Sequence, residues 1–361
     1  MDLVRFLLWH PLLFFPKQVH GRRLCQPSSC KLLTIFKSFP KLTAKNRTQE
    51  KCTGWEYDLR ENGYAVVKNA IPRDRAIKYQ EKAYEWLKSF GTELDFNRPE
   101  TWIKENLPVQ SKINTFNGYC VIHEKFMWDA RMEPGVLESF AKIWGTDELL
   151  SSFDSLNITF PNRKDVTKLG AWEHIDQSPF RRGLHCIQGI IALSPAGPED
   201  GGLLVYPGSH KLTDEFFDTQ THNNTWETID RFIFDEAQLG WFAKRGCNPH
   251  KVIAEVGDLI LWDSRTIHYG SFPTEKSNQI RTAIYAAFTP ARLASEETLA
   301  KKADIFKEWG GTTHWPHDNI RIREVKTFLE DGTRDPRDRE APLELPEMTD
   351  KLLKLAGVKR Y

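Results

Sequence analysis

The sequence lacks the features of disulfide-stabilised, nucleic-acid-binding and membrane-spanning proteins. Its six cysteines are scattered and include no C-x-x-C pair, which excludes a disulfide framework or zinc knuckle and favours a reducing compartment. Fifty basic and 49 acidic side chains leave a net charge of +1, so no global field attracts nucleic acid or an anionic membrane. We therefore expect a soluble globular enzyme with no nucleic-acid partner.

The first fifty residues differ from the rest of the chain. They carry nine Lys and Arg residues against two acidic ones, and their apolar run VRFLLWHPLLFFP is too short for a membrane span and is interrupted by proline. Residues 1–50 are typical of an organelle presequence, and a disordered extension is the alternative. We predict a cytoplasmic location, with organelle targeting as the alternative and membrane contact only through this segment.

Sequence patterns typical of strands dominate the second half of the chain. Residues 150–290 contain short apolar runs separated by Gly, Pro, Asn and Asp, a pattern typical of an all-β sandwich or barrel. Helical spacing of apolar residues precedes this region at 73–91 and 134–145 and returns at 295–310. The sequence therefore predicts a mainly β fold that is flanked by α-helices.

One β domain with two extensions is the expected organisation. We predict that the domain covers residues 55–295 and that residues 296–361 form a helical and irregular extension packed on it. Between the strands, residues 211–250 are polar and aromatic with little strand periodicity. We expect an insertion with short helices there, because insertions on a rigid sheet often form a substrate lid.

The segment AWEHIDQSPF places a histidine and an acid one residue apart. If this segment is a strand, His174 and Asp176 point to the same face, and an imidazole and a carboxylate are presented to one ion. An isolated H-x-D pair is more often a satisfied polar pair than a metal site. The interpretation therefore depends on residues further along the chain.

A third metal ligand and an anion anchor follow about a hundred residues downstream. His268 completes a two-histidine, one-carboxylate facial triad, which holds Fe(II) on one face and leaves three positions open. Two open positions suit the keto-acid chelate of 2-oxoglutarate, and the last suits O2. Arg281, on the next strand, has a planar fork that matches the far carboxylate of this co-substrate.

The sequence resembles the phytanoyl-CoA dioxygenase-like family of Fe(II)/2-oxoglutarate oxygenases. The resemblance rests on HID at 174–176, DGGLLVYPGSHK at 200–211, GDLILWDSRTIHYG at 257–270 and NQIRTAIYAAFTP at 278–290. It spans about residues 55–290, and the order and spacing of the motifs make it specific. It implies a double-stranded β-helix, a cupin-like jelly roll, wrapped by N- and C-terminal helices.

The resemblance also implies a site and a reaction. His174, Asp176 and His268 are the implied iron ligands, and Arg281 is the implied anchor for 2-oxoglutarate. Members of the family decarboxylate 2-oxoglutarate to succinate and oxidise an unactivated C–H bond, usually by hydroxylation. Halogenating relatives lack the carboxylate ligand, so Asp176 favours hydroxylation over halogenation, while desaturation, ring closure and epimerisation remain open.

Several residues compete for these roles. His210, in the motif YPGSHK, is the chief rival for the third metal position, and His185 is a weaker one. Arg292 is a more distant competitor of Arg281. We expect Cys186 to be a small buried hydrophobe rather than a nucleophile.

Two amides and two arginines have open assignments. Gln188 and Asn157 lie in apolar strands where a buried amide needs a partner, which is either the 2-oxoglutarate carboxylate or the backbone. Arg181 and Arg182 follow the H-x-D motif and either meet an anionic substrate or form salt bridges. The histidines of THWPHDN, residues 313–319, are expected to pack across the barrel or to contribute to the pocket rim.

These observations lead to one principal hypothesis. The protein is expected to be an Fe(II)- and 2-oxoglutarate-dependent dioxygenase that uses O2 and hydroxylates a small or medium-sized organic substrate. A cupin-type dioxygenase or isomerase that does not use 2-oxoglutarate, and a jelly-roll binding module without catalysis, are the alternatives. We expect a monomer or a homodimer, and no motif identifies the substrate.

Overall fold

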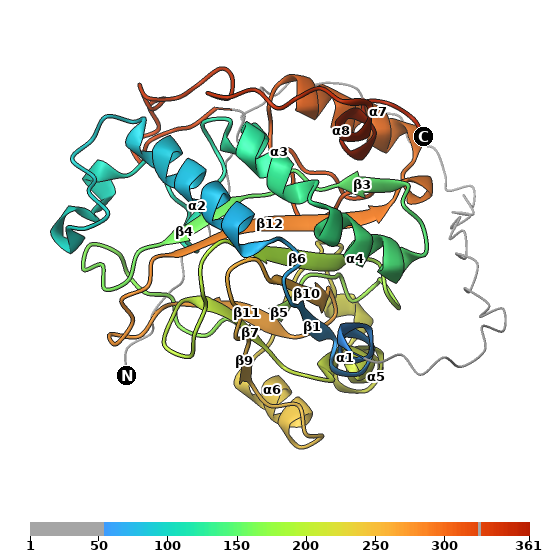
Figure 1. The fold of residues 1–361 in the computed structure, drawn as a ribbon. Coiled ribbons are helices and arrows are strands. Elements are labelled where there is room, and N and C mark those ends of the chain that lie inside the picture. Colours follow the sequence, from blue (N-terminus) through green and yellow to red (C-terminus); the bar gives the residue numbers. More distant parts are fainter. Residues whose placement is uncertain (1–53, 324–325) are drawn as a thin grey trace, which may run out of the picture. The chain divides into compact units, whose positions relative to one another are not determined.

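Two antiparallel β-sheets form the centre of the computed structural model, which describes residues 54–323 and 326–361 (Figure 1). Apolar side chains from both sheets, including Ile190 of the larger and Val205 of the smaller, pack together between them. This arrangement is the predicted double-stranded β-helix. The targeting prediction for residues 1–50 lies outside the described residues.

The central strands of the larger sheet are buried on both faces. Its order is β1 (Tyr64–Val67), β10 (Leu259–Asp263), β6 (Ile187–Ala192), β12 (Arg281–Pro290), β4 (Leu156–Thr159) and β2 (Thr115–Phe116), and β3 (Leu149–Ser151) pairs with the far end of β12. Strands β6 and β10 are buried along their whole length. Their sequences, IQGIIA and LILWD, are accordingly almost continuously apolar, as strands covered on both sides must be.

The smaller sheet carries the H-x-D motif. Its order is β8 (Phe232–Ile233), β5 (His174–Ile175), β11 (His268–Ser271), β7 (Gly202–Val205) and β9 (His250–Lys251). Strand β5 lies between β8 and β11. Segments that are about ninety residues apart in the sequence therefore become neighbours.

Helices cover the outer face of the larger sheet (Figure 1). They are α2 (Arg73–Lys88), α3 (Lys125–Arg131), α4 (Pro134–Trp144), α7 (Glu296–Lys307) and α8 (Asp350–Leu355). Phe140 of α4 packs on Phe288 of β12 with ring centroids 4.9 Å apart. Gly145, at φ 66°, ends α4 in the left-handed conformation that glycine adopts without strain.

The remaining elements are short. Helix α1 (Trp55–Asn62) leads into β1, and α5 (Thr213–Gln220) and α6 (Glu236–Ala243) belong to the insertion. Single 3-10 turns occur at Pro99–Thr101, Lys104–Asn106, Val121–His123, Ser209–Lys211, Asn223–Thr225 and Ala291–Leu293. In the part of the chain that the structure describes, no helix combines the length and apolar character needed to cross a membrane.

The insertion contains one element that the sequence did not indicate. Short helices were expected between residues 211 and 250, and α5 and α6 are found there. Strand β8 is additional, and its Ile233 pairs with His174 of β5. The domain boundary at residue 295 stays a prediction, because the described residues belong to one compact unit.

Candidate active site

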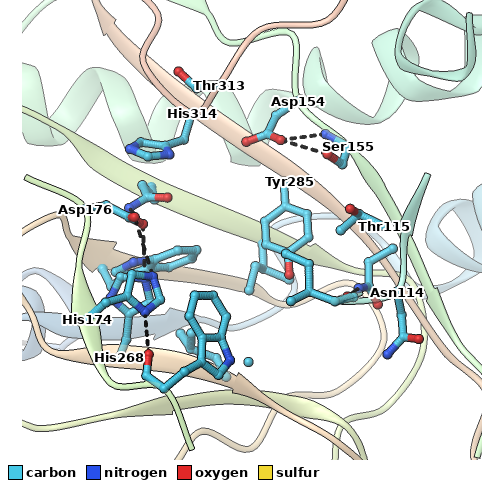
Figure 2. Close-up of a pocket in the computed structure, with 18 of the residues that line it drawn as sticks. Asn114, Thr115, Asp154, Ser155, His174, Asp176, His268, Tyr285, Thr313 and His314 are labelled. Atoms are coloured by element: carbon cyan, nitrogen blue, oxygen red, sulfur yellow. Dashed lines mark hydrogen bonds and ion pairs between the residues drawn. The ribbon is translucent and has the colours of Figure 1, made fainter. Parts of the chain in front are cut away.

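Two histidines and an aspartate converge on the smaller sheet. His174 begins β5 and His268 begins β11, and the antiparallel register places them directly opposite each other. Asp176 lies just past β5, with Oδ1 3.5 Å from Nε2 of His174 and Oδ2 3.2 Å from Nε2 of His268 (Figure 2). The candidate ligand atoms all lie within 4.8 Å of one another, and no other such group of three occurs in residues 54–323 and 326–361.

A hydrogen bond to a backbone carbonyl holds each imidazole ring. Nδ1 of His174 lies 3.1 Å from the carbonyl oxygen of Trp172, and Nδ1 of His268 lies 2.8 Å from that of Thr266. In a neutral ring, Nδ1 donates to this carbonyl and Nε2 keeps its lone pair for a metal. The indole of Trp172 stacks on His174 with centroids 4.1 Å apart. The hydrogen bond and this stacking together fix the orientation of the His174 ring.

The electrostatic surroundings favour metal binding. Burial, together with the nearby His268, lowers the pKa of His174, which favours the neutral ring. Burial alone raises the pKa of Asp176, but the attraction of His314 and His174 outweighs it and holds the pKa well below its usual range. Neutral imidazole and ionised carboxylate are the forms that bind metals, so the donor set fits Fe(II).

A buried amide orients the carboxylate. Nε2 of Gln188, on β6, donates to Oδ2 of Asp176 at 2.9 Å, and the backbone N–H of Asp176 donates to the carbonyl of Ser264 at 3.0 Å. The sequence suggested two partners for Gln188, the co-substrate or the backbone. Its partner in the structure is a third group, the candidate ligand Asp176.

Replacing Gln188 by leucine is expected to weaken Fe(II) binding about tenfold, because loss of an outer hydrogen bond to a metal ligand costs ~10–100-fold in affinity. Anaerobic titration of the apoprotein with Fe(II) measures the dissociation constant. Gln279→Leu is the control, since that amide donates to the backbone of Ile280. An unchanged dissociation constant in Gln188→Leu contradicts the assignment.

Arg281 and Asn157 form the second part of the site. Arg281, at the start of β12, is 6% exposed, and its Nη1 donates to Oδ1 of Asn157 on β4 at 2.6 Å. Nδ2 of Asn157 donates to the carbonyl of Ile113. No carboxylate among the described residues pairs with Arg281. A buried guanidinium with only a neutral partner is suited to an anionic ligand.

Comparison with known proteins places this arrangement in a family. The family model for phytanoyl-CoA dioxygenase (PhyH) matches residues 59–283. The chain belongs to the phytanoyl-CoA dioxygenase family. It is therefore an enzyme of the Fe(II)/2-oxoglutarate-dependent oxygenases, with iron as cofactor and 2-oxoglutarate as co-substrate.

Individual proteins resemble this chain in sequence or in fold. The chain is 42% identical over 268 residues, 73% of its length and 86% of the relative, to the Ava biosynthesis cluster protein O of Aspergillus versicolor. It is 21% identical over 282 residues, 67% of its length and 77% of the relative, to a putative phytanoyl-CoA dioxygenase of Dictyostelium discoideum. The GlcNAc Inducible Gene 2 protein of Candida albicans shares the fold at 14% identity, with a TM-score of 0.56 over 84% of this chain and 76% of the other.

A cavity of about 370 Å³ connects the two parts of the site in this phytanoyl-CoA dioxygenase family member. His174, Asp176, His268 and Arg281 all line it. Further lining residues include Asn114, Thr115, Asp154, Ser155, Trp172, Gln188, Trp262, Tyr285, Thr313 and His314. The metal candidates and the arginine thus share one space with room for a small organic molecule.

Two residues that line the cavity, His314 and Asp154, match no motif in the sequence. His314, from the C-terminal extension, lies near Asp176, as expected for a rim residue, and its Nε2 is buried with no hydrogen-bond partner in the part of the chain described (Figure 2). Asp154, in the loop between β3 and β4, had no signal, because a lone aspartate in SSFDSLN matches no motif. Both are brought to the cavity by long-range packing.

The rival residues lie outside this cluster. Nε2 of His210 contacts the carbonyl of Arg60 at 3.1 Å, and His210 does not line the cavity. His185 contacts the carbonyl of Arg182, and it does not line the cavity either. Cys186 is fully buried, and burial raises the pKa of its thiol well above the usual range. The thiol is therefore suited to packing rather than to nucleophilic attack.

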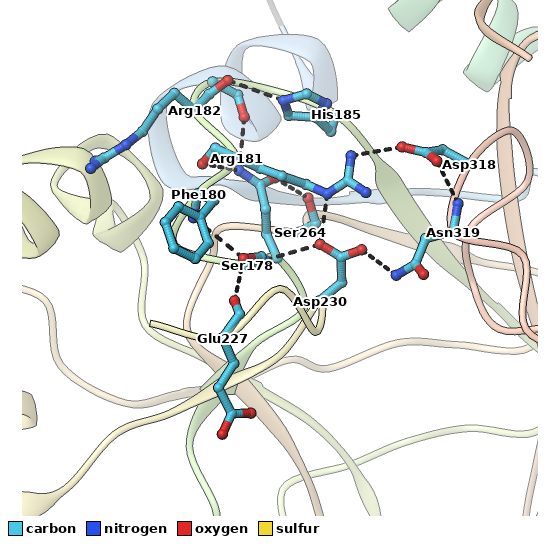
Figure 3. Close-up of polar contacts among 12 residues, drawn as sticks. Ser178, Phe180, Arg181, Arg182, His185, Glu227, Asp230, Ser264, Asp318 and Asn319 are labelled. Carbon is cyan, nitrogen blue, oxygen red and sulfur yellow. Dashed lines mark hydrogen bonds and ion pairs between the residues drawn. The ribbon is translucent and has the colours of Figure 1, made fainter. Parts of the chain in front are cut away.

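Ion pairs tie three segments together beside the cavity (Figure 3). Nε of Arg181 lies 2.7 Å from Oδ1 of Asp230 in the insertion, and its Nη1 lies 2.8 Å from Oδ2 of Asp318 in the C-terminal extension. The guanidinium also stacks 4.7 Å from the ring centre of Trp315. Arg182 pairs with Asp218. The two roles considered for these arginines were contact with an anionic substrate and formation of salt bridges. The structure shows the salt bridges.

Replacing Arg181 by methionine is expected to lower the free energy of unfolding by about 2 kcal/mol, because Asp230 is 7% exposed and loses its cation. Chemical denaturation measures the change. The neighbouring Arg182→Met is the matched control, with an expected change below ~0.5 kcal/mol, because its partner Asp218 is largely exposed. Equal losses in both variants contradict a special role for Arg181.

Proposed function

We propose that this protein is an Fe(II)- and 2-oxoglutarate-dependent dioxygenase that hydroxylates a small or medium-sized organic substrate. In this proposal His174, Asp176 and His268 hold the iron, and Arg281 binds the distal carboxylate of 2-oxoglutarate. The observation that carries the proposal is the buried two-histidine, one-carboxylate cluster, which faces a cavity that also contains Arg281.

The reaction has a simple balance. Bound iron would activate O2, which is the oxidant, and 2-oxoglutarate would supply two of the four electrons that O2 accepts, so that substrate R–H, 2-oxoglutarate and O2 give R–OH, succinate and CO2. The protein positions the reactants, and Nε2 of His174 and of His268 and the carboxylate of Asp176 form one face of the metal site. The other side is left for the co-substrate and O2.

The surrounding side chains orient the co-substrate and exclude water. The guanidinium of Arg281 presents its fork to a carboxylate, while Asn157 holds one arm of it at 2.6 Å. The indoles of Trp172 and Trp262 lie 4.1 Å and 5.4 Å from the rings of His174 and His268. These apolar surfaces reduce the local dielectric and strengthen each polar contact in the site.

The carboxylate of Asp176 supports hydroxylation rather than halogenation, since a halide needs the coordination position that this residue is proposed to fill. Desaturation, ring closure and epimerisation use the same ligand set. Mass spectrometry of the product separates hydroxylation, which adds one oxygen atom, from desaturation and ring closure, which each remove two hydrogen atoms, and from epimerisation, which leaves the mass unchanged.

Anaerobic addition of Fe(II) and 2-oxoglutarate to the purified protein tests the proposal. A weak visible charge-transfer band of the chelate is expected, followed on admission of O2 by one succinate for each 2-oxoglutarate consumed. The proposal is contradicted if the folded protein gives no band, or if it oxidises organic substrates without forming succinate. The second result supports a cupin-type dioxygenase instead.

A further inference from the structure

The cavity contains one carboxylate that the proposed chemistry does not use. Asp176 is a candidate metal ligand, and Arg281 is assigned to the co-substrate. Asp230 also lines the cavity, but its carboxylate is neutralised by Arg181 at 2.7 Å. The remaining lining carboxylate is Asp154.

Asp154 is buried but only half satisfied. The residue is 8% exposed, and Oδ1 accepts a hydrogen bond from the backbone N–H of Ser155 at 2.8 Å. The hydroxyl of Ser155 lies 3.0 Å from Oδ1 and shares its single proton with a bond to Oδ1 of Asn117. Oδ2 has no hydrogen-bond or ion-pair partner among the described residues, and in Figure 2 it points into the cavity. One carboxylate oxygen is therefore left for a ligand.

The nearest buried cation is not bonded to the carboxylate. Arg131 is fully buried, and its Nη2 donates to the backbone carbonyl of Asp154 at 2.6 Å, while its Nη1 donates to the carbonyl of Ile122. These bonds fix the loop and the direction of the Asp154 side chain. The charges of Arg131 and Asp154 attract each other, but no hydrogen bond joins the guanidinium to the carboxylate, so Oδ2 keeps its capacity to accept from a ligand.

The location of Asp154 relative to the metal candidates determines which part of a substrate meets each of them. Figure 2 shows Asp154 and Ser155 on one side of the cavity and His174, Asp176 and His268 on the other, with the ring of Tyr285 below Asp154. A molecule that binds Asp154 at one end extends across the cavity toward the metal candidates. The carbon atom presented to the metal is then separated from the group that Asp154 binds.

We propose that the cavity selects a substrate with a protonated amine or a guanidinium group, which donates to Oδ2 of Asp154 and directs a more distant carbon to the metal. This inference rests on the proposed function, because the same cavity must contain the metal and 2-oxoglutarate. A charge-assisted bond of this kind is both strong and directional. Arg231, Arg321 and Arg323 also line the cavity. Arg231 and Arg321 are exposed, so their charge is screened by water, and Arg323 is half-buried.

Three matched probes test this inference without knowledge of the natural substrate. Hexylguanidine, its neutral isostere hexylurea and the anion hexanoate are titrated by calorimetry into the protein loaded with Fe(II) and 2-oxoglutarate under nitrogen. Hexylguanidine is expected to bind at least ten times more tightly than hexylurea. The inference is overturned, without any variant, if the wild-type protein binds hexylguanidine and hexylurea equally or binds hexanoate more tightly than hexylguanidine.

Two variants then assign the preference to Asp154. Asp154→Asn keeps the size of the side chain and is expected to bind hexylguanidine and hexylurea with equal affinity, while its affinity for hexylurea stays as in the wild type. Ser155→Ala removes one bond to Oδ1 but keeps the charge, so it should retain the tenfold preference. A tenfold preference that survives in Asp154→Asn assigns the selection to another residue and overturns the proposal.

The outcome is separable from that of the proposed function. Binding of 2-oxoglutarate to the Fe(II)-loaded protein is measured first, by its charge-transfer band. If the band is absent, the proposed function fails. If the band forms but the cationic probe has no advantage, only the assignment of the substrate class fails.

Discussion

Replacing His268 by alanine is expected to abolish iron-dependent turnover of 2-oxoglutarate and to weaken Fe(II) binding by at least ~100-fold. Even a residue that only supports a metal ligand contributes ~10–100-fold to affinity, and His268 is proposed to be a ligand itself. Its Nε2 lies 3.2 Å from Oδ2 of Asp176, and its ring is 4% exposed.

Two readouts check this prediction. Anaerobic Fe(II) titration gives the metal affinity, and succinate formation gives the rate. His210→Ala is the matched control, because His210 is also a buried histidine and its sequence context made it the chief rival ligand. If His210→Ala loses iron and His268→Ala keeps it, with both variants folded by circular dichroism, the proposed ligand set is wrong.

Replacing Arg281 by leucine is expected to raise the KM for 2-oxoglutarate by roughly 30- to 1,000-fold, since removing one partner of a buried, hydrogen-bonded charge pair costs about 2–4 kcal/mol. The effect should appear in KM rather than in the metal affinity, because Arg281 is proposed to contact the distal carboxylate and not the iron. Asn157 would also lose its charged donor.

A comparison of co-substrates sharpens this test. 2-Oxobutyrate has the keto-acid group but no distal carboxylate, so its affinity should be almost the same in Arg281→Leu as in the wild type. Arg292→Leu is the control, because Arg292 is exposed and was the competing anchor in the sequence. An equal loss of affinity for both keto acids in Arg281→Leu indicates a general disruption of the site instead.

The candidate metal site was largely predictable from the sequence because two of its three candidate ligands lie in one short segment. The pair His174 and Asp176 lies within three residues, and strand geometry places both side chains on one face. The structure adds a detail: β5 consists of His174 and Ile175 alone, and Asp176 lies beyond it, held by a bond from its backbone to Ser264. The side chains converge although the strand is short.

The partners of the buried amides were predictable only in part, since Asn157 donates to the backbone carbonyl of Ile113, one of its two expected partners, whereas Gln188 donates to Asp176. The sequence indicated that Gln188 and Asn157 each need a hydrogen-bond partner, because both lie in apolar strands. Which partner is available depends on the neighbours that the sheets bring together. Gln188 donates to Asp176, and Asn157 accepts from Arg281, which lies 124 residues further along the chain.

The sequence by itself determined the class of fold, the family resemblance and the residue types of the site, because periodicity and short motifs depend on neighbours in the chain. The tertiary structure alone decided that Asp154 lines the same cavity as the triad, and that Arg181 joins the insertion to the C-terminal extension. These contacts link segments far apart in the sequence. They depend on how the two sheets and their covering loops pack, and no local pattern of residues encodes that packing.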